Sequence, residues 1–347
     1  MTTQTPARLS TLDNFFADLL PRVEAEMSAV LDSFSAPPLF STMLKYHLGF
    51  ADAAGNATRA PSGKRLRPAL LMLACEVCNG DTDAALPAAA AVELLHNFSL
   101  IHDDIEDRDG LRRGRPTVWR LWGEAQAINA GDAMFAMAHL ALLRCAERRL
   151  HPAHVLAAMR TFDEMCVKLT IGQHLDLSFE SRSDLTVTEY LQMITGKTAA
   201  LIAASCAIGA QLAGATPDQT DALIEFGQQI GTAFQMQDDL LGIWGDPEQT
   251  GKHSTDLAHR KKTLPVLYAA ERNPDLRRRY FQDRTPFSQA DLEWVKAAVE
   301  EAGGRKYAES LASEAHQLAL DALRRIPEHP ARRLLFELSQ RLIGRNR

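Results

Sequence analysis

The chain has 347 residues, of which 46% are hydrophobic and 24% are charged, as in soluble globular proteins with an ample core. Its net charge of −6 argues against the basic surface of a nucleic-acid-binding protein, so we expect no nucleic acid partner. No uninterrupted apolar run approaches the ~20 residues of a transmembrane segment. The N-terminus also lacks the pattern of a secretory signal peptide, and we expect a cytoplasmic protein.

The five cysteines are odd in number and lie inside apolar helical stretches, so we expect reduced, buried thiols. Cys75 and Cys78 form a lone CxxC pair. Because there is no second pair and no βαβ context, this spacing indicates one face of a core helix rather than a zinc or redox site.

Hydrophobic periodicity predicts helices along almost the whole chain and no credible strand. The first, amphipathic helix covers 9–34, and Pro21 is expected to bend or restart it. Gly196 interrupts a later helix, which a local kink that exposes Lys197 and Thr198 would explain. The remaining helices are expected at 42–50, 68–77, 87–107, 117–150, 153–177, 188–212, from 217 into 234–242, and at 264–271, 289–302, 307–325 and 331–343.

About a dozen helices without a long Pro/Gly/Ser-rich linker indicate one all-α domain over residues 1–347. Within it we expect N-terminal helices over 1–60 and the core over 61–347. Facing helices of such a bundle commonly build metal sites in its interior, so acidic residues on core helices are the first candidates for a site.

The densest group of charged residues runs over 100–117, with the sequence LIHDDIEDRDGLRRGRPT. At about 100° of rotation per residue, Asp103, Asp104 and Asp107 fall on one helical face, where their repulsion is unfavourable unless cations lie among them. Grouped carboxylates suit Mg²⁺, which keeps waters and substrate phosphates in its shell. The arginines that follow can bind phosphate bidentately, so the stretch indicates a diphosphate site. They are Arg112, Arg113 and Arg115.

A second helix ends in FQMQDDLLG (234–242), where Asp238 and Asp239 repeat the paired carboxylates. One DDxxD motif alone is as typical of a solvated, salt-bridged surface as of a metal site. Two helices that end in paired aspartates before a basic loop are far more specific, because they can face each other across a bundle interior. We therefore predict that the two clusters hold several Mg²⁺ ions against one diphosphate, with a second diphosphate near Lys64 and Arg67.

Seven segments together resemble the trans-type isoprenyl diphosphate synthases of the polyprenyl synthetase family, in the order and spacing of that family. The resemblance covers nearly the whole chain and implies an all-α, single-domain helical bundle with a central cavity. It also implies a prenyltransferase that joins isopentenyl diphosphate to an allylic diphosphate (dimethylallyl, geranyl or farnesyl). The segments are GKRLRP (63–68), ELLHNFSLIHDDIED (93–107), LRRGRPT (111–117), GQHLDL (172–177), GKTAAL (196–201), FQMQDDLLG (234–242) and DLAHRKKTLP (256–265).

The resemblance implies a role for each matching residue. The five aspartates of the two motifs would bind the allylic diphosphate through three Mg²⁺ ions, for which Mn²⁺ can substitute. Thr198 and Gln235 would lie beside the reacting carbons. The basic residues would divide between the substrates, with Arg112, Lys197 and Lys252 at the allylic diphosphate, Lys261 at a further basic position, and Lys64, Arg67, His96 and Arg113 at isopentenyl diphosphate.

The implied chemistry agrees with this set of residues. Breaking the allylic C–O bond leaves a carbocation and a diphosphate anion, and metal ions and cationic side chains stabilise the departing charge. The cation alkylates the double bond of isopentenyl diphosphate, and the leaving diphosphate can accept the proton that is lost. No nucleophilic Ser or Cys is needed, but an apolar cavity must keep water away.

The second motif departs from the family pattern at Gly242, where a third acidic residue is expected; Asp246 follows and could in part replace it. Product length is assigned from the residues before the first motif, because bulky side chains there limit chain growth in the family. Phe98 and Ser99 at these positions resemble those of twenty-carbon producers. We therefore predict geranylgeranyl diphosphate, with a shorter (farnesyl) or a longer polyprenyl diphosphate as the alternative.

Two other functions are compatible with parts of the pattern. A class I terpene cyclase also uses DDxxD and Mg²⁺ in an all-α fold, but it usually carries an NDxxSxxxE-type second motif and needs no isopentenyl site. A non-catalytic subunit of a heteromeric synthase would show eroded aspartates or arginines, which the intact first motif argues against. The family precedent further implies a homodimer packed through helices.

Overall fold

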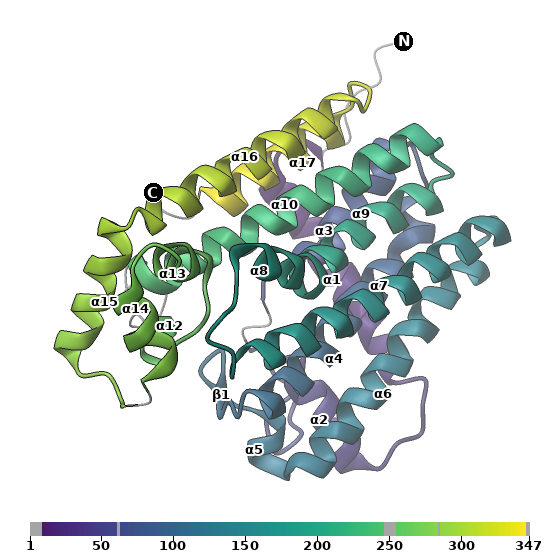
Figure 1. The fold of residues 1–347 in the computed structure, drawn as a ribbon. Coiled ribbons are helices and arrows are strands. Elements are labelled where there is room, and N and C mark those ends of the chain that lie inside the picture. Colours follow the sequence, from purple (N-terminus) through teal and green to yellow (C-terminus); the bar gives the residue numbers. More distant parts are fainter. Residues whose placement is uncertain (1–8, 61–62, 246–254, 284, 345–347) are drawn as a thin grey trace. The chain divides into compact units, whose positions relative to one another are not determined.

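The computed structural model describes residues 9–60, 63–245, 255–283 and 285–344, which form helices joined by short loops (Figure 1). The sheet in this part of the chain is a hairpin of two short strands, so the prediction of an all-α fold is confirmed. The single domain over 1–347 stays a prediction. The chain divides into two compact units: unit 1 comprises residues 1–161, 205–220 and 329–334, and unit 2 comprises 162–204, 221–328 and 335–347.

Unit 1 is organised around α4 (Thr82–Glu106), whose Ala-rich first half is almost completely buried. Asp81 caps the start of this helix and accepts from two backbone N–H groups. The predicted helix over 9–34 is α1 (Leu12–Leu31), which continues without a restart through Pro21, an exposed residue of this helix. The other helices of unit 1 are α2 (Pro38–His47), α3 (Leu66–Val77), α5 (Val118–Trp122), α6 (Glu124–Leu143) and the 3₁₀ helix Arg144–Arg148.

The segment between α4 and α5 forms a β-hairpin, so the prediction of no strand is wrong here. Strands β1 (Leu111–Arg112) and β2 (Arg115–Pro116) pair antiparallel. The two residues between them, Arg113 and Gly114, both have a positive φ, at 54° and 76°. A two-residue type I′ hairpin turn requires positive φ at both central residues, and glycine adopts it without strain. The Arg-Gly pair was therefore a usable turn signal.

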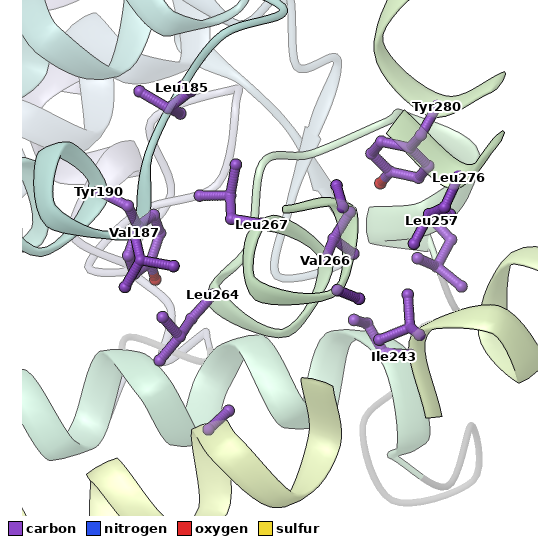
Figure 2. Close-up of a cluster of buried hydrophobic side chains, with 14 of the residues drawn as sticks. Leu185, Val187, Tyr190, Ile243, Leu257, Leu264, Val266, Leu267, Leu276 and Tyr280 are labelled. Atoms are coloured by element: carbon purple, nitrogen blue, oxygen red, sulfur yellow. The ribbon is translucent and has the colours of Figure 1, made fainter. Parts of the chain in front are cut away.

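Unit 2 contains a large apolar cluster, to which α8, α10, α13, α15 and α16 contribute. Figure 2 shows Tyr190 of α8 beside Leu264, the first residue of α13. Most of the helices predicted in this part of the chain are found within a few residues of their expected ends. The helices lying wholly or partly in unit 2 are α7 (Pro152–Phe179), α8 (Val187–Ile194), α9 (Ala200–Leu212), α10 (Pro217–Trp244), α12 (Thr255–Ala258), α13 (Leu264–Ala270), α14 (Pro274–Arg277), α15 (Gln289–Glu301), α16 (Gly304–Arg324) and α17 (Pro330–Ile343).

The predicted interruption at Gly196 is confirmed as a π-helical turn, Thr195–Ala199, between α8 and α9. Gly196 packs against Gly172 of α7. A Cβ on Gly196 would lie 2.8 Å from the carbonyl oxygen of Lys168, and a Cβ on Gly172 would overlap the backbone N of Lys197. The two glycines therefore let the backbones of α7 and the π-helical turn cross at close range.

Two helical segments, 82–106 and 187–212, are long and apolar enough to cross a membrane by length and composition. In each segment 78% of the apolar window is buried inside the protein. This burial is typical of the core helices of a soluble protein, which pass the same test of hydropathy. Cytoplasmic residence stays a prediction.

The five cysteines are free thiols, as predicted; four of them are buried and Cys78 is half-buried. Burial raises the pKa of Cys75, Cys145, Cys166 and Cys206 to about 12 and that of Cys78 to about 11. Because the thiolate is the reactive form, we expect Ellman's reagent to modify Cys78 slowly and the others only after unfolding in guanidinium. Rapid modification of any other thiol in the folded protein would contradict this prediction.

Candidate functional site

The first group of predicted site residues lies at the C-terminal end of α4. Asp103 is half-buried, and Asp107, the C-cap residue, is exposed. Asp104 is only 1% exposed, and Arg112 of β1 donates from Nε to its Oδ1 at 2.6 Å. Burial raises the pKa of Asp104 to about 6, against the opposing effect of Arg112. The three carboxylates therefore do not share one open face, because Asp104 is turned into the protein, where it holds Arg112.

The third arginine of this stretch, Arg115, has a structural role. It donates from Nη1 to the carbonyl oxygen of Tyr46 at 3.1 Å and from Nη2 to that of Ala51 at 3.0 Å. Its guanidinium also lies 3.9 Å from the centroid of the Tyr46 ring. Thr117 donates to the carbonyl oxygen of Asp109 at 2.8 Å, which closes the loop after α4. These bonds hold the hairpin against the end of α2.

A buried ion pair joins the GKRLRP segment to α4. Arg65 has left-handed backbone (φ 47°), is 2% exposed, and donates from Nη1 to Oε1 of Glu93 at 2.6 Å. Asn97 donates to the same oxygen at 3.1 Å. Arg65 therefore anchors this segment. This pair was not predicted, although a glutamate within an apolar helix is a signal for a buried partner.

Arg67, the last basic residue of GKRLRP, lies near His96 of α4. Burial, Arg67 and Arg113 lower the pKa of His96 well below its ordinary value, so its imidazole is neutral. Burial also lowers the pKa of Arg67, and Lys64 is exposed. A Cβ on Gly63 would lie 2.8 Å from Nη2 of Arg113. The absence of a side chain at this position therefore lets the guanidinium of Arg113 lie against the backbone of Gly63. Positive charge grouped in this way suits an anion.

In unit 2, Asp239 of α10 is the centre of the second group and is 1% exposed. Its Oδ2 accepts from the hydroxyl of Tyr190 and from the backbone N–H of Leu264 at 2.9 Å. Gln235 donates to its Oδ1 at 3.4 Å. Burial raises the pKa of Asp239 to about 6. Asp239 therefore connects α8, α10 and the start of α13, whereas the neighbouring Asp238 is exposed.

The two aspartate pairs share one arrangement. In each pair the first residue, Asp103 or Asp238, is accessible, and the second, Asp104 or Asp239, is buried and bonded to other parts of its own unit. A carboxylate must present an oxygen at the surface to take part in an open metal site. Adjacent aspartates in the sequence are therefore not equivalent in the fold.

The π-helical turn carries two of the predicted residues. Nζ of Lys197 lies 2.5 Å from Oδ2 of Asp176, and Thr198 donates from Oγ1 to Oε1 of Gln235 at 2.8 Å. The structure thus brings Lys197, Thr198 and Gln235 together within unit 2. It adds Asp176, which lies three residues after Gln173 in GQHLDL and to which sequence analysis gave no role.

The glycine in the second motif has a steric explanation. A Cβ on Gly242 would overlap Oδ2 of Asp256 in α12, so this carboxylate lies where a side chain at 242 would begin. Nζ of Lys261 lies 3.7 Å from the same Oδ2. Asp246, the substitute offered by the sequence, lies outside the described residues, as does the predicted site residue Lys252.

The accessible carboxylates fit a divalent cation that prefers oxygen ligands. Within the described residues, no three His, Cys, Asp or Glu side chains converge on a closed metal site. Mg²⁺, however, is usually bound by one or two carboxylates together with waters and substrate phosphates. In unit 1, Asp103 and Asp107, one turn apart on α4, have the donor atoms for this kind of open site, and in unit 2 Asp238 on α10 has them.

The two residues assigned to product length lie next to each other on α4 but differ in their contacts. The ring centroid of Phe98 lies 5.0 Å from that of Phe135 on α6 and 4.8 Å from that of His102. Ser99 donates from Oγ to the carbonyl oxygen of His96 at 2.9 Å. Phe98 therefore packs between α4 and α6, and Ser99 adds no bulk beside it.

Comparisons with known proteins agree with this geometry. The model of the polyprenyl synthetase family matches residues 51–301. The (2E,6E)-farnesyl diphosphate synthase of Mycobacterium tuberculosis is 45% identical over 306 residues, which cover 86% of this chain and 84% of that protein. The geranylgeranyl diphosphate synthase of the same organism is 42% identical over 314 residues, 88% of each chain. The crystal structure of a polyprenyl synthetase from Streptomyces coelicolor A3(2) aligns with a TM-score of 0.86 at 38% identity and covers 94% of this chain and 99% of that one.

An all-helical fold with two aspartate motifs and basic clusters defines a class of enzymes that act on prenyl diphosphates. The chain belongs to the polyprenyl synthetase family, that of the trans-isoprenyl diphosphate synthases. It is a prenyltransferase. The family uses a divalent metal with isopentenyl and allylic diphosphates as substrates. Because the relatives are named for farnesyl and for geranylgeranyl diphosphate, family membership leaves the product length open.

Proposed function

We propose that this enzyme condenses isopentenyl diphosphate with dimethylallyl, geranyl or farnesyl diphosphate, and that its product is geranylgeranyl diphosphate. The observation that carries this proposal is the arrangement in unit 1, where accessible Asp103 and Asp107 end the same helix that carries His96 near Arg67 and Arg113. A prenyl transfer between two diphosphates needs both a metal-assisted leaving group and a cationic site for the second substrate.

The allylic diphosphate is proposed to bind through Asp103, Asp107 and Asp238. Three Mg²⁺ ions are expected there, with Mn²⁺ as a substitute, and they would supply charge neutralisation as the C–O bond breaks. Arg112 and Lys197, each paired with a carboxylate of its own unit, would donate to the diphosphate oxygens. That both units act on one substrate rests on the family. The further residues proposed for this diphosphate are Lys252 and Lys261.

Asp104 and Asp239 are proposed to act indirectly. Asp104 fixes the guanidinium of Arg112, and Asp239 accepts from Gln235 and Tyr190. Both would therefore position groups that contact the substrate. This reassigns two of the five aspartates that the resemblance gives to the metal ions.

Isopentenyl diphosphate is proposed to bind in unit 1, where burial keeps His96 neutral beside Arg67 and Arg113. The planar guanidinium groups can bind diphosphate oxygens bidentately, and neutral His96 can add one N–H donor. Lys64 is exposed, and its ammonium group is proposed to contact the same diphosphate. The two guanidinium groups, the imidazole and the ammonium group together therefore supply several N–H donors for one diphosphate.

During the reaction, the C–O electron pair of the allylic substrate leaves with the diphosphate. The double bond of isopentenyl diphosphate then forms the new C–C bond, and the proton lost from its adjacent carbon passes to the leaving diphosphate. The hydroxyl of Thr198 donates a hydrogen bond to the side-chain amide of Gln235. We propose that the dipoles of these two groups, held in place by this bond, lie beside the carbocation. Side chains that are already oriented need no rearrangement when the charge develops.

One incubation tests the reaction. Purified enzyme, isopentenyl diphosphate, Mg²⁺ and each allylic primer are combined, and the dephosphorylated products are separated by chain length. We expect one prenyl alcohol of geranylgeraniol length, abolished by EDTA. A hydrocarbon formed from a long primer alone would instead indicate a terpene cyclase, and turnover only after addition of a second chain would indicate a non-catalytic subunit.

Product length has its own prediction. Phe98→Ala removes the ring that packs against Phe135, so we expect products longer by one or more isoprene units. Ser99→Phe adds bulk beside it and should shorten the product to farnesyl diphosphate. The same product analysis measures both variants. An unchanged product distribution in Phe98→Ala would show that this ring does not limit chain growth.

We propose that the enzyme is a cytoplasmic homodimer. Support comes from large apolar side chains that are exposed on α6 and α7, a pattern typical of interaction surfaces. Light scattering after size exclusion should give twice the chain mass of 38.3 kDa, and a monomer would contradict the proposal. The exposed residues are Ile128, Leu140, Leu143, Leu156, Val167 and Ile171.

A further inference from the structure

His47, the last residue of α2, carries a buried polar atom that lacks a partner. Its Nε2 is buried and forms no hydrogen bond with any part of the chain that the structure describes. Leaving a buried polar atom unpaired costs free energy, so such atoms in a native fold call for a specific explanation. His47 lines a small pocket with Asp104, Arg112 and Arg113, and this location points to a ligand.

The charges around the pocket favour an anion. Asp104 is the one acidic residue among those that line the pocket, and its Oδ1 is paired with Arg112, whereas its Oδ2 is buried without a hydrogen-bond partner within the described residues. The three arginines of the lining outnumber this one carboxylate. Arg115 donates to two backbone carbonyl oxygens instead of pointing to a carboxylate. Arg113 forms no ion pair with the described residues, and burial and Arg65 lower its pKa. The pocket therefore keeps positive charge next to the unpaired Nε2.

The position of His47 is fixed by the residue before it. Tyr46 donates from its hydroxyl to the carbonyl oxygen of Pro116 at 2.8 Å, and its ring packs edge-on against Trp122 at 5.2 Å. Arg115 stacks on the same ring and donates a hydrogen bond to the backbone carbonyl oxygen of Tyr46. The end of α2 is thus bound both to the hairpin and to α5, and His47 has little freedom to leave the pocket.

We propose that His47 donates a hydrogen bond from Nε2 to the diphosphate of isopentenyl diphosphate, as a binding residue in addition to His96, Arg67 and Arg113. This inference rests on the proposed function. It also assigns a role to α2, which precedes the segment 51–301 that matches the family.

The electrostatic environment explains why a histidine suits this position. Burial, Arg112 and Arg113 lower the pKa of His47 to about 3, so the imidazole is neutral and adds no repulsion to the empty cluster. A neutral imidazole still carries one N–H, which can donate to a diphosphate oxygen. His47 also contributes to the lowered pKa of His96, which indicates that both rings lie in the same basic cluster.

The test compares His47→Leu, which removes the donor, with His47→Gln, which keeps an N–H at similar reach. For His47→Leu we expect a rise of about tenfold in KM for isopentenyl diphosphate, the effect of one hydrogen bond to a charged group. KM for the allylic primer and kcat should change less than about twofold, and His47→Gln should recover most of the affinity. Lys45→Met, on the same helix and paired with Asp32, is the matched control and should behave as wild type.

Calorimetric titration of each variant with inorganic diphosphate measures the same contact without turnover. Weaker binding in His47→Leu, with recovery in His47→Gln, is the expected result. Unchanged KM and unchanged diphosphate affinity in a folded His47→Leu would overturn the proposal, as would an equal fall in kcat and thermal stability in both variants. A wild-type chain that made no prenyl product would contradict the proposed function. The titration with inorganic diphosphate needs no turnover, so it would still decide the role of His47.

Discussion

Asp103→Asn is expected to lower kcat by about a hundredfold to a thousandfold, the usual effect of removing one group that stabilises developing charge. Asp103 is the accessible member of its pair and lies one turn from Asp107 at the end of α4. Its carboxylate would contribute an oxygen to Mg²⁺, which an amide replaces poorly. The Mg²⁺ concentration that gives half-maximal activity should therefore rise together with the fall in kcat.

Two matched variants make this prediction sharper. Glu106→Gln removes the same charge from an exposed position of the same helix and should leave kcat within about twofold. Asp104→Asn removes the buried partner of Arg112, so it should lower thermal stability and raise KM for the allylic substrate with little change in the Mg²⁺ requirement. If Asp103→Asn and Asp104→Asn had the same Mg²⁺ dependence, the division between accessible and buried aspartates would be wrong.

The sequence was sufficient to predict the helices and the grouping of charged residues. Helical periodicity and turn residues are local properties, so α4, α10 and the interruption at Gly196 could be predicted from the residues themselves. The hairpin at 111–116 was missed because its strands have only two residues each and show no alternation. The Arg-Gly turn was its one local signal.

The division within each aspartate pair could not be predicted in the same way. A helical wheel gives the angle of Asp104 relative to Asp103, but it does not tell which side of α4 the hairpin covers. Only the tertiary structure shows that Arg112 reaches back to Asp104 and that Tyr190 reaches Asp239. The steric reason for a glycine at position 242 is likewise non-local, because the carboxylate that occupies this space belongs to Asp256 on another helix.

Gly172→Ala is expected to destabilise the protein by about 3 kcal/mol, the upper end of the range for overpacking a well-packed interior. The added methyl would overlap the backbone N of Lys197. A backbone atom cannot move aside as the end of a flexible side chain can, so α7 and the π-helical turn would have to separate. Thermal unfolding should show a fall of several degrees in Tm.

The same substitution should also lower activity, because the π-helical turn carries Lys197 and Thr198. Their bonds to Asp176 and Gln235 depend on where the turn lies, and we expect a fall in kcat of at least about tenfold. Gly110→Ala is the control, since a Cβ there would meet no atom within 4 Å. A Gly172→Ala variant with wild-type Tm and kcat would show that the backbones can separate at little cost. A lower Tm with normal kcat would instead show that the close crossing serves stability alone, and that Lys197 and Thr198 keep their positions without it.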